Sequence, residues 1–134
     1  MSGSTADSNV VLYLAGFEAG KAARARQVVT PGSPLSVQVL NEVANVFIRK
    51  WQRSWSETEE FLDLVRGLAV VQPIDEGTHQ LGIAVARRHR LNVYDGMIIA
   101  SALRADCDIL YSEDMHHGLL VDGRLTIINP FLDA

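Results

Sequence analysis

The sequence predicts an α/β fold, a three-layer α/β/α sandwich around a mostly parallel sheet. Short apolar and β-branched runs, as at residues 68–72 and 109–111, alternate with segments whose apolar residues recur at helical spacing. Such alternation is typical of βαβ units, in which helices cover both faces of parallel strands. The length of 134 residues is that of one domain, so we expect a single domain over residues 1–134.

The first half of the chain is expected to be mainly helical. A segment rich in Ala, Lys and Arg predicts a short helix over residues 18–29, and a loop rich in Pro, Gly and Ser follows at residues 30–34. Ser36 is a good N-cap residue, and apolar residues recur at helical spacing from there to about Lys50.

Two further helices and a strand are expected next. Residues 56–59, Ser-Glu-Thr-Glu, fit a capping box that opens a helix. The β-branched run at residues 68–72 predicts a short buried strand. Asp75 is placed to cap a helix over residues 76–89.

The last third continues the alternation. A strongly apolar helix is expected at about residues 96–105, followed by a strand at residues 109–111. The pair Asp122-Gly123 predicts a turn, and residues 125–128 predict a last strand.

Composition excludes several classes of protein. Hydrophobic residues make up 48% and charged residues 21%, which is ordinary for a globular domain. The 12 basic and 16 acidic residues give a formal net charge of -4, so binding of nucleic acid through bulk positive charge is excluded. A polyanion would have to be met through local patches or bound cations.

Cysteine use and hydropathy set the expected compartment. Cys107 is the single cysteine, so the chain has no intramolecular disulfide and no cysteine-built zinc site. No apolar run approaches the roughly 18 residues that cross a bilayer. We therefore expect no membrane span and a cytoplasmic protein.

Four acidic residues lie near the expected ends of elements. Asp7 lies near the first strand, Asp114 follows the strand at residues 109–111, Asp95 begins a helix and Glu42 lies in the second turn of another. Ligands of open parallel sheets bind outside the carboxyl ends of the strands. A doubly wound fold can bring these four acids to that edge.

Clustered carboxylates favour a divalent cation. Their mutual repulsion raises their pKa values, and a bound cation removes the repulsion. Mg²⁺ and Mn²⁺ prefer oxygen ligands, and such a site can activate a water and neutralise charge on a phosphodiester. Taken singly, any one acid is more often a solvated surface group or a helix cap than a ligand, and Asp95 at a helix start fits a cap better than a ligand.

Three segments carry a family resemblance. The first is Asp7-Ser8-Asn9 with its apolar continuation (7–13), the second is the stretch that ends in Glu42 (36–42), and the third runs through residues 94–102 and 107–115 to Asn129-Pro130-Phe131. In this order and at this chain length they resemble the PIN-domain nucleases, and specifically the VapC-type toxins of bacterial toxin–antitoxin pairs.

The resemblance implies roles for individual residues. It implies that the catalytic acids, which also hold the metal, are Asp7, Glu42, Asp95 and Asp114. It further implies residues that orient those acids or contact the substrate, namely Ser8, Asn9, Ser112 and Glu113, with Glu113 also open to a role as a further ligand.

The same resemblance implies an activity and partners. The family's usual activity is Mg²⁺- or Mn²⁺-dependent endoribonuclease cleavage of RNA phosphodiester bonds. Its usual partner is a small antitoxin protein, and its domains usually form homodimers. Two departures stand out: residues 3–6, Gly-Ser-Thr-Ala, replace the apolar strand that precedes the first acid, and Gly96 stands where Ala is common. Gly and Ser are poor strand formers, so three expectations stay open: the first strand is unusually weak, the start of the chain has been altered, or an N-terminal segment is missing.

The basic and aromatic residues of the segment 49–55 have three open interpretations. They could stack on and contact single-stranded RNA, or bind a dimer mate or the antitoxin. They could also be a helix C-terminus with favourable cations and partly buried tryptophans.

Other functions remain as alternatives. One is a non-catalytic PIN-like module that binds RNA or protein, and another is a PIN nuclease outside any toxin–antitoxin pair. A phosphoaspartyl receiver needs a late lysine, whereas the last lysine here is Lys50. The sequence contains no phosphate-binding glycine motif, which makes a nucleotide-binding protein a poor fit.

Overall fold

The structure, a computed structural model, describes residues 3–132; the other four residues of the expected 1–134 domain lie outside this range. Its strands are β1 (Gly3–Ala6), β2 (Pro34–Ser36), β3 (Val70–Gln72), β4 (Cys107–Tyr111), β5 (Leu120–Val121) and β6 (Leu125–Ile128). Its helices are α1 (Ser8–Leu12), the 3₁₀-helix η1 (Tyr13–Ala15), α2 (Ala19–Val28), α3 (Val37–Asn45), the π-helix η2 (Val46–Lys50), α4 (Trp55–Leu68), α5 (Glu76–His89) and α6 (Val93–Arg104).

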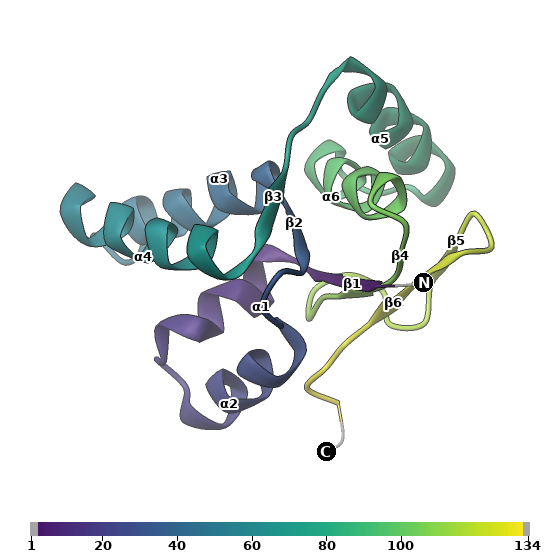
Figure 1. Ribbon diagram of the computed structural model, residues 1–134. Helices are drawn as coiled ribbons and strands as arrows, with labels where there is room; N and C mark the ends of the chain where they lie inside the picture. Colours follow the sequence, from purple (N-terminus) through teal and green to yellow (C-terminus); the bar gives the residue numbers. More distant parts are fainter. Residues whose placement is uncertain (1–2, 133–134) are drawn as a thin grey trace.

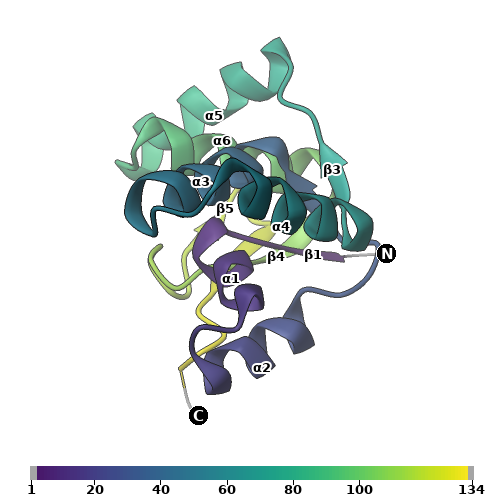
Figure 2. The same ribbon diagram turned by 90° about the vertical axis from the view of Figure 1, so that its left-hand side faces the viewer.

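The sheet is mostly parallel, as the sequence predicts. Its strand order is β1-β4-β6-β5; β1, β4 and β6 are parallel, and β5 pairs antiparallel with β6. A separate parallel pair joins β2 and β3. Helices α1 and α2 lie on one side of the main sheet and α5 and α6 on the other (Figures 1 and 2), which confirms the three-layer architecture.

One hydrophobic core holds the layers together. The β4 and β6 side chains Leu110 and Ile127 are fully buried, as are Ile98 of α6 and Val10 of α1, and all belong to one packed cluster. Apolar burial of this kind is the main favourable contribution to folding. Within residues 3–132, no helix is both long and apolar enough to cross a membrane.

The polar N-terminal segment does form a strand. Ala6 pairs with Tyr111 in the parallel register of β1 and β4, and Thr5 and Ala6 are both buried. The Thr5 hydroxyl donates a hydrogen bond to the Pro34 carbonyl of β2 at 2.6 Å. Backbone pairing on one side and this side-chain bond on the other therefore hold a strand whose residues have low strand propensity.

Two local expectations in the middle of the chain are wrong. The capping box is made by Ser54 and Glu57, not by residues 56–59, so α4 begins at Trp55. The strand expected at residues 68–72 is only β3, because Leu68 still belongs to α4, and it is not buried: Val70 is 55% exposed.

The expectations for the helices α5, α6 and α3 agree better with the structure. Asp75 caps α5 over the range expected, and its side chain accepts from the Thr78 backbone amide. Helix α6 starts before the expected position because Asn92, rather than Asp95, is its N-cap. The helix that begins after Ser36 reaches Lys50 as expected, but its last five residues are the π-helix η2.

Close packing of α5 against α6 explains Gly96. A Cβ atom at this position would overlap the Gly82 carbonyl oxygen of α5 and lie 3.0 Å from the Ala86 Cβ. The residue that departs from the family pattern is therefore one of two glycines, with Gly82 of α5, that allow the two helices to approach closely.

We expect Gly96→Ala to destabilise the protein by about 1–3 kcal/mol, because the backbone of α5 must move to admit the methyl group. Gly67→Ala is the matched control: it also lies in a helix, nothing lies within 4 Å of its added Cβ, and alanine favours helix by up to about 1 kcal/mol. Urea unfolding measures both changes. Equal stability of Gly96→Ala and the parent would contradict the packing argument.

Candidate active site at the carboxyl edge of the sheet

Asp7 lies at the centre of the candidate site. It directly follows β1, is 3% exposed, and its backbone amide donates to the Tyr111 carbonyl at the end of β4. Its Oδ1 accepts from the Ser8 amide at 2.7 Å, and its Oδ2 accepts from the Ser112 hydroxyl at 2.7 Å. Asp7 is therefore fixed by the ends of two parallel strands, as the sheet topology predicts.

Glu42 is joined to Asp7 through Ser8. The Ser8 hydroxyl donates to Glu42 Oε1 at 2.7 Å, while Gln38, one helical turn earlier on α3, donates to Glu42 Oε2 at 3.1 Å. Ser36 caps α3 by accepting from the Gln38 amide, which fixes where the helix starts. Gln38 was not singled out from the sequence, although its i, i+4 spacing from Glu42 is a usable signal.

Asn9 and Ser112 connect Asp7 to Asp114. The Asn9 side-chain amide donates to Asp7 Oδ2 at 3.2 Å and to Asp114 Oδ2 at 3.1 Å. The Ser112 hydroxyl, which donates to Asp7, also accepts from the Asp114 and Met115 amides. The structure thus places both small polar residues in contact with the acids.

Asp95 joins the site from the first turn of α6. Its backbone amide donates to the Asn92 side chain at 2.8 Å, and the Asn92 side-chain amide donates back to Asp95 Oδ2 at 3.1 Å. Asp95 therefore takes part in the helix cap, while its carboxylate is close enough to Glu42 and Asp114 for their charges to act on it.

The four acids repel one another. Burial raises the pKa of Asp7 from 3.8 to about 6; hydrogen bonds from Ser112 and Ser8 oppose the rise, and the charges of Asp95 and Glu42 add to it. Burial also raises the pKa of Asp95, and Glu42 and Asp114 add to that rise. Among the described residues, no lysine or arginine is a cause of either shift, and none forms an ion pair with any of the four acids.

The donor set fits Mg²⁺ or Mn²⁺. All four side chains offer carboxylate oxygens, the ligand type these ions prefer, and their mutual repulsion favours a cation. Within residues 3–132, however, no group of three or more Asp, Glu, His or Cys side chains is arranged to hold a metal ion as it stands. In this arrangement Ser8, Asn9 and Ser112 satisfy oxygens of Asp7, Glu42 and Asp114 that a cation would share.

Glu113 is occupied elsewhere. Its carboxylate forms an ion pair with Lys21 of α2 and accepts from the Tyr13 hydroxyl at 2.7 Å. Its backbone amide donates to Asn9 Oδ1 at 3.0 Å. Glu113 therefore ties the loop before Asp114 to α2 and η1. Lys21 and Tyr13 were missed from the sequence, because no local spacing relates them to residue 113.

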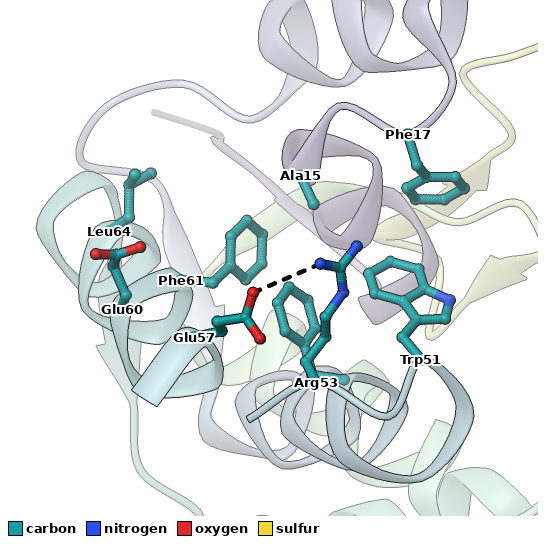
Figure 3. A pocket seen from close by; sticks show the side chains of 9 residues that line it. Ala15, Phe17, Trp51, Arg53, Glu57, Glu60, Phe61 and Leu64 are labelled. Carbon is teal, nitrogen blue, oxygen red and sulfur yellow. Dashed lines mark ion pairs between the residues drawn. The ribbon is translucent and has the colours of Figure 1, made fainter. Parts of the chain in front are cut away.

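The basic and aromatic segment 49–55 borders an apolar groove beside α4 (Figure 3). The groove has a volume of about 420 Å³. Phe17 and Trp51 form one end of it, and Phe61 and Leu64 of α4 line the other. Arg53 crosses the middle and pairs with Glu57 at 3.5 Å.

Fold and site together define a class: a small α/β domain with four acids from separate elements at the carboxyl edge of its sheet. The sequence profile of the PIN domain family matches residues 5–117. The chain belongs to the PIN domain family, which confirms the family resemblance and the fold expected from it.

Solved structures share this fold at low sequence identity. A toxin–antitoxin complex from Klebsiella pneumoniae matches with a TM-score of 0.72 at 17% identity, covering 96% of this chain and 98% of that one. VapC20 of Mycobacterium tuberculosis, described as a sarcin–ricin loop cleaving toxin, matches with a TM-score of 0.68 at 16% identity, covering 83% of this chain and 89% of that one.

A third structure is VapBC2 from Rickettsia felis bound to a promoter DNA fragment. It matches with a TM-score of 0.61 at 11% identity, covering 83% of this chain and 86% of that one. A search of curated proteins finds no match. At these identities the structural matches establish the fold alone.

The raised pKa of Asp7 predicts an unusual pH dependence of stability without metal. The folded chain binds a proton on the Asp7 carboxylate more tightly than the unfolded chain does. The contribution of Asp7 to the free energy of unfolding therefore grows as pH falls through about 6. Between about pH 7.5 and pH 5 we expect Asp7 to add on the order of 1 kcal/mol to the free energy of unfolding.

The measurement is urea unfolding in chelator across this pH range, with Asp7→Asn as the comparison. The readout is how steeply the free energy of unfolding changes with pH in the parent and in the variant. The stabilities themselves are not compared, because the asparagine amide also changes the hydrogen bonds with Ser112 and Asn9. Added Mn²⁺ should stabilise the parent more at the higher pH, where the carboxylate is ionised. Parallel pH profiles for parent and variant would show that Asp7 does not titrate abnormally.

Proposed function

We propose that this protein is a metal-dependent endoribonuclease that hydrolyses RNA phosphodiester bonds, and that it acts as the toxin of a toxin–antitoxin pair. The observation that carries the proposal is the acid cluster at the carboxyl edge. Four carboxylates from separate elements act on one another electrostatically, and Ser8 and Asn9 link three of them, Asp7, Glu42 and Asp114. None of the four forms an ion pair with a basic residue of the described part of the chain.

The proposed roles follow from the contacts. Asp7, Glu42, Asp95 and Asp114 would hold Mg²⁺ or Mn²⁺, which when bound supplies a polarised water and neutralises charge on the phosphodiester. Ser112 and the Ser8 amide hold Asp7 in one orientation, Ser8 and Gln38 hold Glu42, and Asn9 keeps Asp114 beside Asp7. A carboxylate of this set that is not fully used by the cation can accept the proton of the attacking water.

Two lines of comparison support the proposal. Membership of the PIN domain family supports a nuclease. Among the solved structures with this fold, one is described as a toxin that cleaves the sarcin–ricin loop, and others are toxin–antitoxin complexes. The presence of all four acids disfavours the alternative of a non-catalytic binding module.

For the protein partner, we propose the apolar groove of Figure 3. Phe17 and Leu64 are 56% and 62% exposed at its two ends, and exposed apolar surface of this kind marks interaction sites. The occupant we propose is the small antitoxin, because a helix with apolar residues on one face would cover both. The homodimer remains a prediction, which sedimentation of the purified protein tests.

The purified protein, freed of any partner, is expected to cleave RNA with Mg²⁺ or Mn²⁺ and to stop in chelator. Asp95→Asn should reduce cleavage by at least about 10²-fold, since it removes charge from the cation site. The asparagine retains an oxygen for the hydrogen bond from Asn92, so the fold should persist. Gel analysis of a labelled RNA measures cleavage, and circular dichroism checks folding.

The matched control is Asp108→Asn. Asp108 is an exposed acid near the start of β4, at the opposite end of the strand from Asp114, so its removal should leave cleavage unchanged. Cleavage by Asp95→Asn at the parental rate would overturn the site. Binding of RNA by the parent without any cleavage in either metal would favour the non-catalytic alternative.

The toxin assignment has its own test. Induction of the protein in a bacterial host should arrest growth, and co-expression of the product of the neighbouring reading frame should relieve the arrest. Leu64→Asp should weaken capture of that product, because it places a charge in the groove. The control Leu120→Asp, at another exposed leucine on β5, should not. RNA cleavage without growth arrest or a partner would favour a PIN nuclease outside any toxin–antitoxin pair.

A further inference from the structure

We propose that Phe17, Lys50 and Trp51 form a subsite for one unpaired nucleobase of the RNA and its adjoining phosphate, next to the acid cluster. The inference rests on the proposed function. It assigns Lys50 and Trp51 of the segment 49–55 to RNA binding and leaves Arg53 in the groove proposed for the protein partner. A second cavity, of about 340 Å³, carries the argument. Phe17, Lys50 and Trp51 line one part of it, and Ser8, Asn9 and Asp114 line another. The aromatic wall therefore shares one cavity with Asp114, one of the four proposed catalytic acids, and with Ser8 and Asn9, which hydrogen-bond to the acids.

The π-helix η2 delivers the two residues of segment 49–55 that reach this cavity. The Trp51 amide donates to the Val46 carbonyl at 2.9 Å, five residues back, and the Arg53 amide then donates to the Phe47 carbonyl. A π turn adds one residue to a helical turn and is often found at functional sites. Here it ends α3 so that Val46, Lys50 and Trp51 all line the cavity.

The aromatic wall is built before any ligand arrives. Phe17 stacks on Tyr13 with ring centroids 4.9 Å apart, and Trp51 meets Phe17 at 5.0 Å edge to face. Trp51 is in turn packed against the buried Phe47. Although Phe17 contacts both Tyr13 and Trp51, its side chain is still 56% exposed, so part of the ring remains accessible to a base. Every nucleobase has a π face, so such a wall accepts an unpaired base of any sequence.

Lys50 supplies a charge suited to phosphate. It is exposed, it lines the same cavity, and no ion pair joins it to a carboxylate of residues 3–132. Lys21, by contrast, is already paired with Glu113. Phosphate contacts position a nucleic acid, and stacking then adds affinity for an unpaired base.

Charge and position favour RNA over protein as the occupant of this cavity. Its walls combine aromatic rings with the Lys50 ammonium and reach Asp114. The groove of Figure 3 is lined instead by apolar side chains, the Glu60 carboxylate and an internal Arg53–Glu57 pair. Phe17 and Trp51 border both spaces, while Lys50 lines only the cavity and Leu64 only the groove. Substitutions at Lys50 and Leu64 therefore separate the two uses.

The test measures binding of a short unstructured RNA in the Asp95→Asn background with Mg²⁺ present, so that the RNA is not cut. Phe17→Ala and Lys50→Gln should each weaken binding, Phe17→Ala by roughly tenfold, the usual effect of removing one stacking partner. Two matched controls should leave the affinity for RNA unchanged. Leu120→Ala removes an exposed apolar residue on β5, and Arg87→Gln removes an exposed cation on α5.

A scan with abasic nucleotides isolates the stacking. Replacing one nucleotide at a time by an abasic residue should weaken binding to the parent at one position, and Phe17→Ala should lose that sensitivity. Trp51 gives a direct signal: in Trp55→Phe it is the only tryptophan of the chain, and its fluorescence should fall when RNA binds. In the cleaving enzyme, Phe17→Ala should raise KM and leave kcat nearly unchanged.

Several results would overturn the subsite. The first is that Phe17→Ala and Lys50→Gln both bind RNA with the affinity of the parent. The second is that abasic residues weaken binding equally at every position. The third is that the substitutions weaken binding of the protein partner alone, which would assign the cavity to protein. The outcome is separable from that of the proposed function: if the parent cuts RNA while both variants bind it normally, only the subsite fails. If the parent neither binds nor cuts RNA, the proposed function fails first.

Discussion

The candidate site depends on the burial of one carboxylate, that of Asp7, where β1 and β4 end together. The groups that hold its oxygens also hold the rest of the edge: Ser112 fixes the loop that carries Asp114, and Asn9 bridges both aspartates. Burial and like charges raise the pKa of Asp7 to about 6, so the ionised form is destabilising at neutral pH unless a cation is present. Packing of β4 and β6 in the core must offset this local loss of stability.

Two helix caps place the other acids around Asp7. Ser36 sets the start of α3 and so puts Glu42 in its second turn, while Asn92 sets the start of α6 and puts Asp95 in its first turn. The two helices are joined by a buried hydrogen bond from the Ser101 hydroxyl to the Ser36 hydroxyl at 3.1 Å. Short polar side chains at helix ends therefore decide where two of the four carboxylates lie.

Sequence patterns predicted most of the architecture, because caps and apolar periodicity are local. Helix α5 and strand β6 have the expected bounds, and the topology alone predicted that acids distant in sequence would meet at one edge. Local patterns failed where two solutions are equivalent: Ser54-x-x-Glu57 and Ser56-x-x-Glu59 both fit a capping box, and the structure has the first. They also failed for the Lys21–Glu113 pair, whose partners are 92 residues apart in sequence. The functions of the four acids remain a proposal.

Under the proposed function, the formal charge of -4 is a poor guide to partners because its distribution matters more than its sum. Of five acids near the carboxyl edge, Glu113 is neutralised within the protein by Lys21, and the other four act on each other without a basic partner among the described residues. A phosphodiester approaching this edge without a cation meets the same repulsion that already raises the pKa of Asp7. Under the proposed function, cation and RNA binding are therefore linked: the cation lowers the repulsion felt by the phosphate, and the phosphate adds oxygen ligands for the cation. In this proposal an acidic chain can bind a polyanion, with affinity that depends on the bound metal as well as on basic residues such as Lys50.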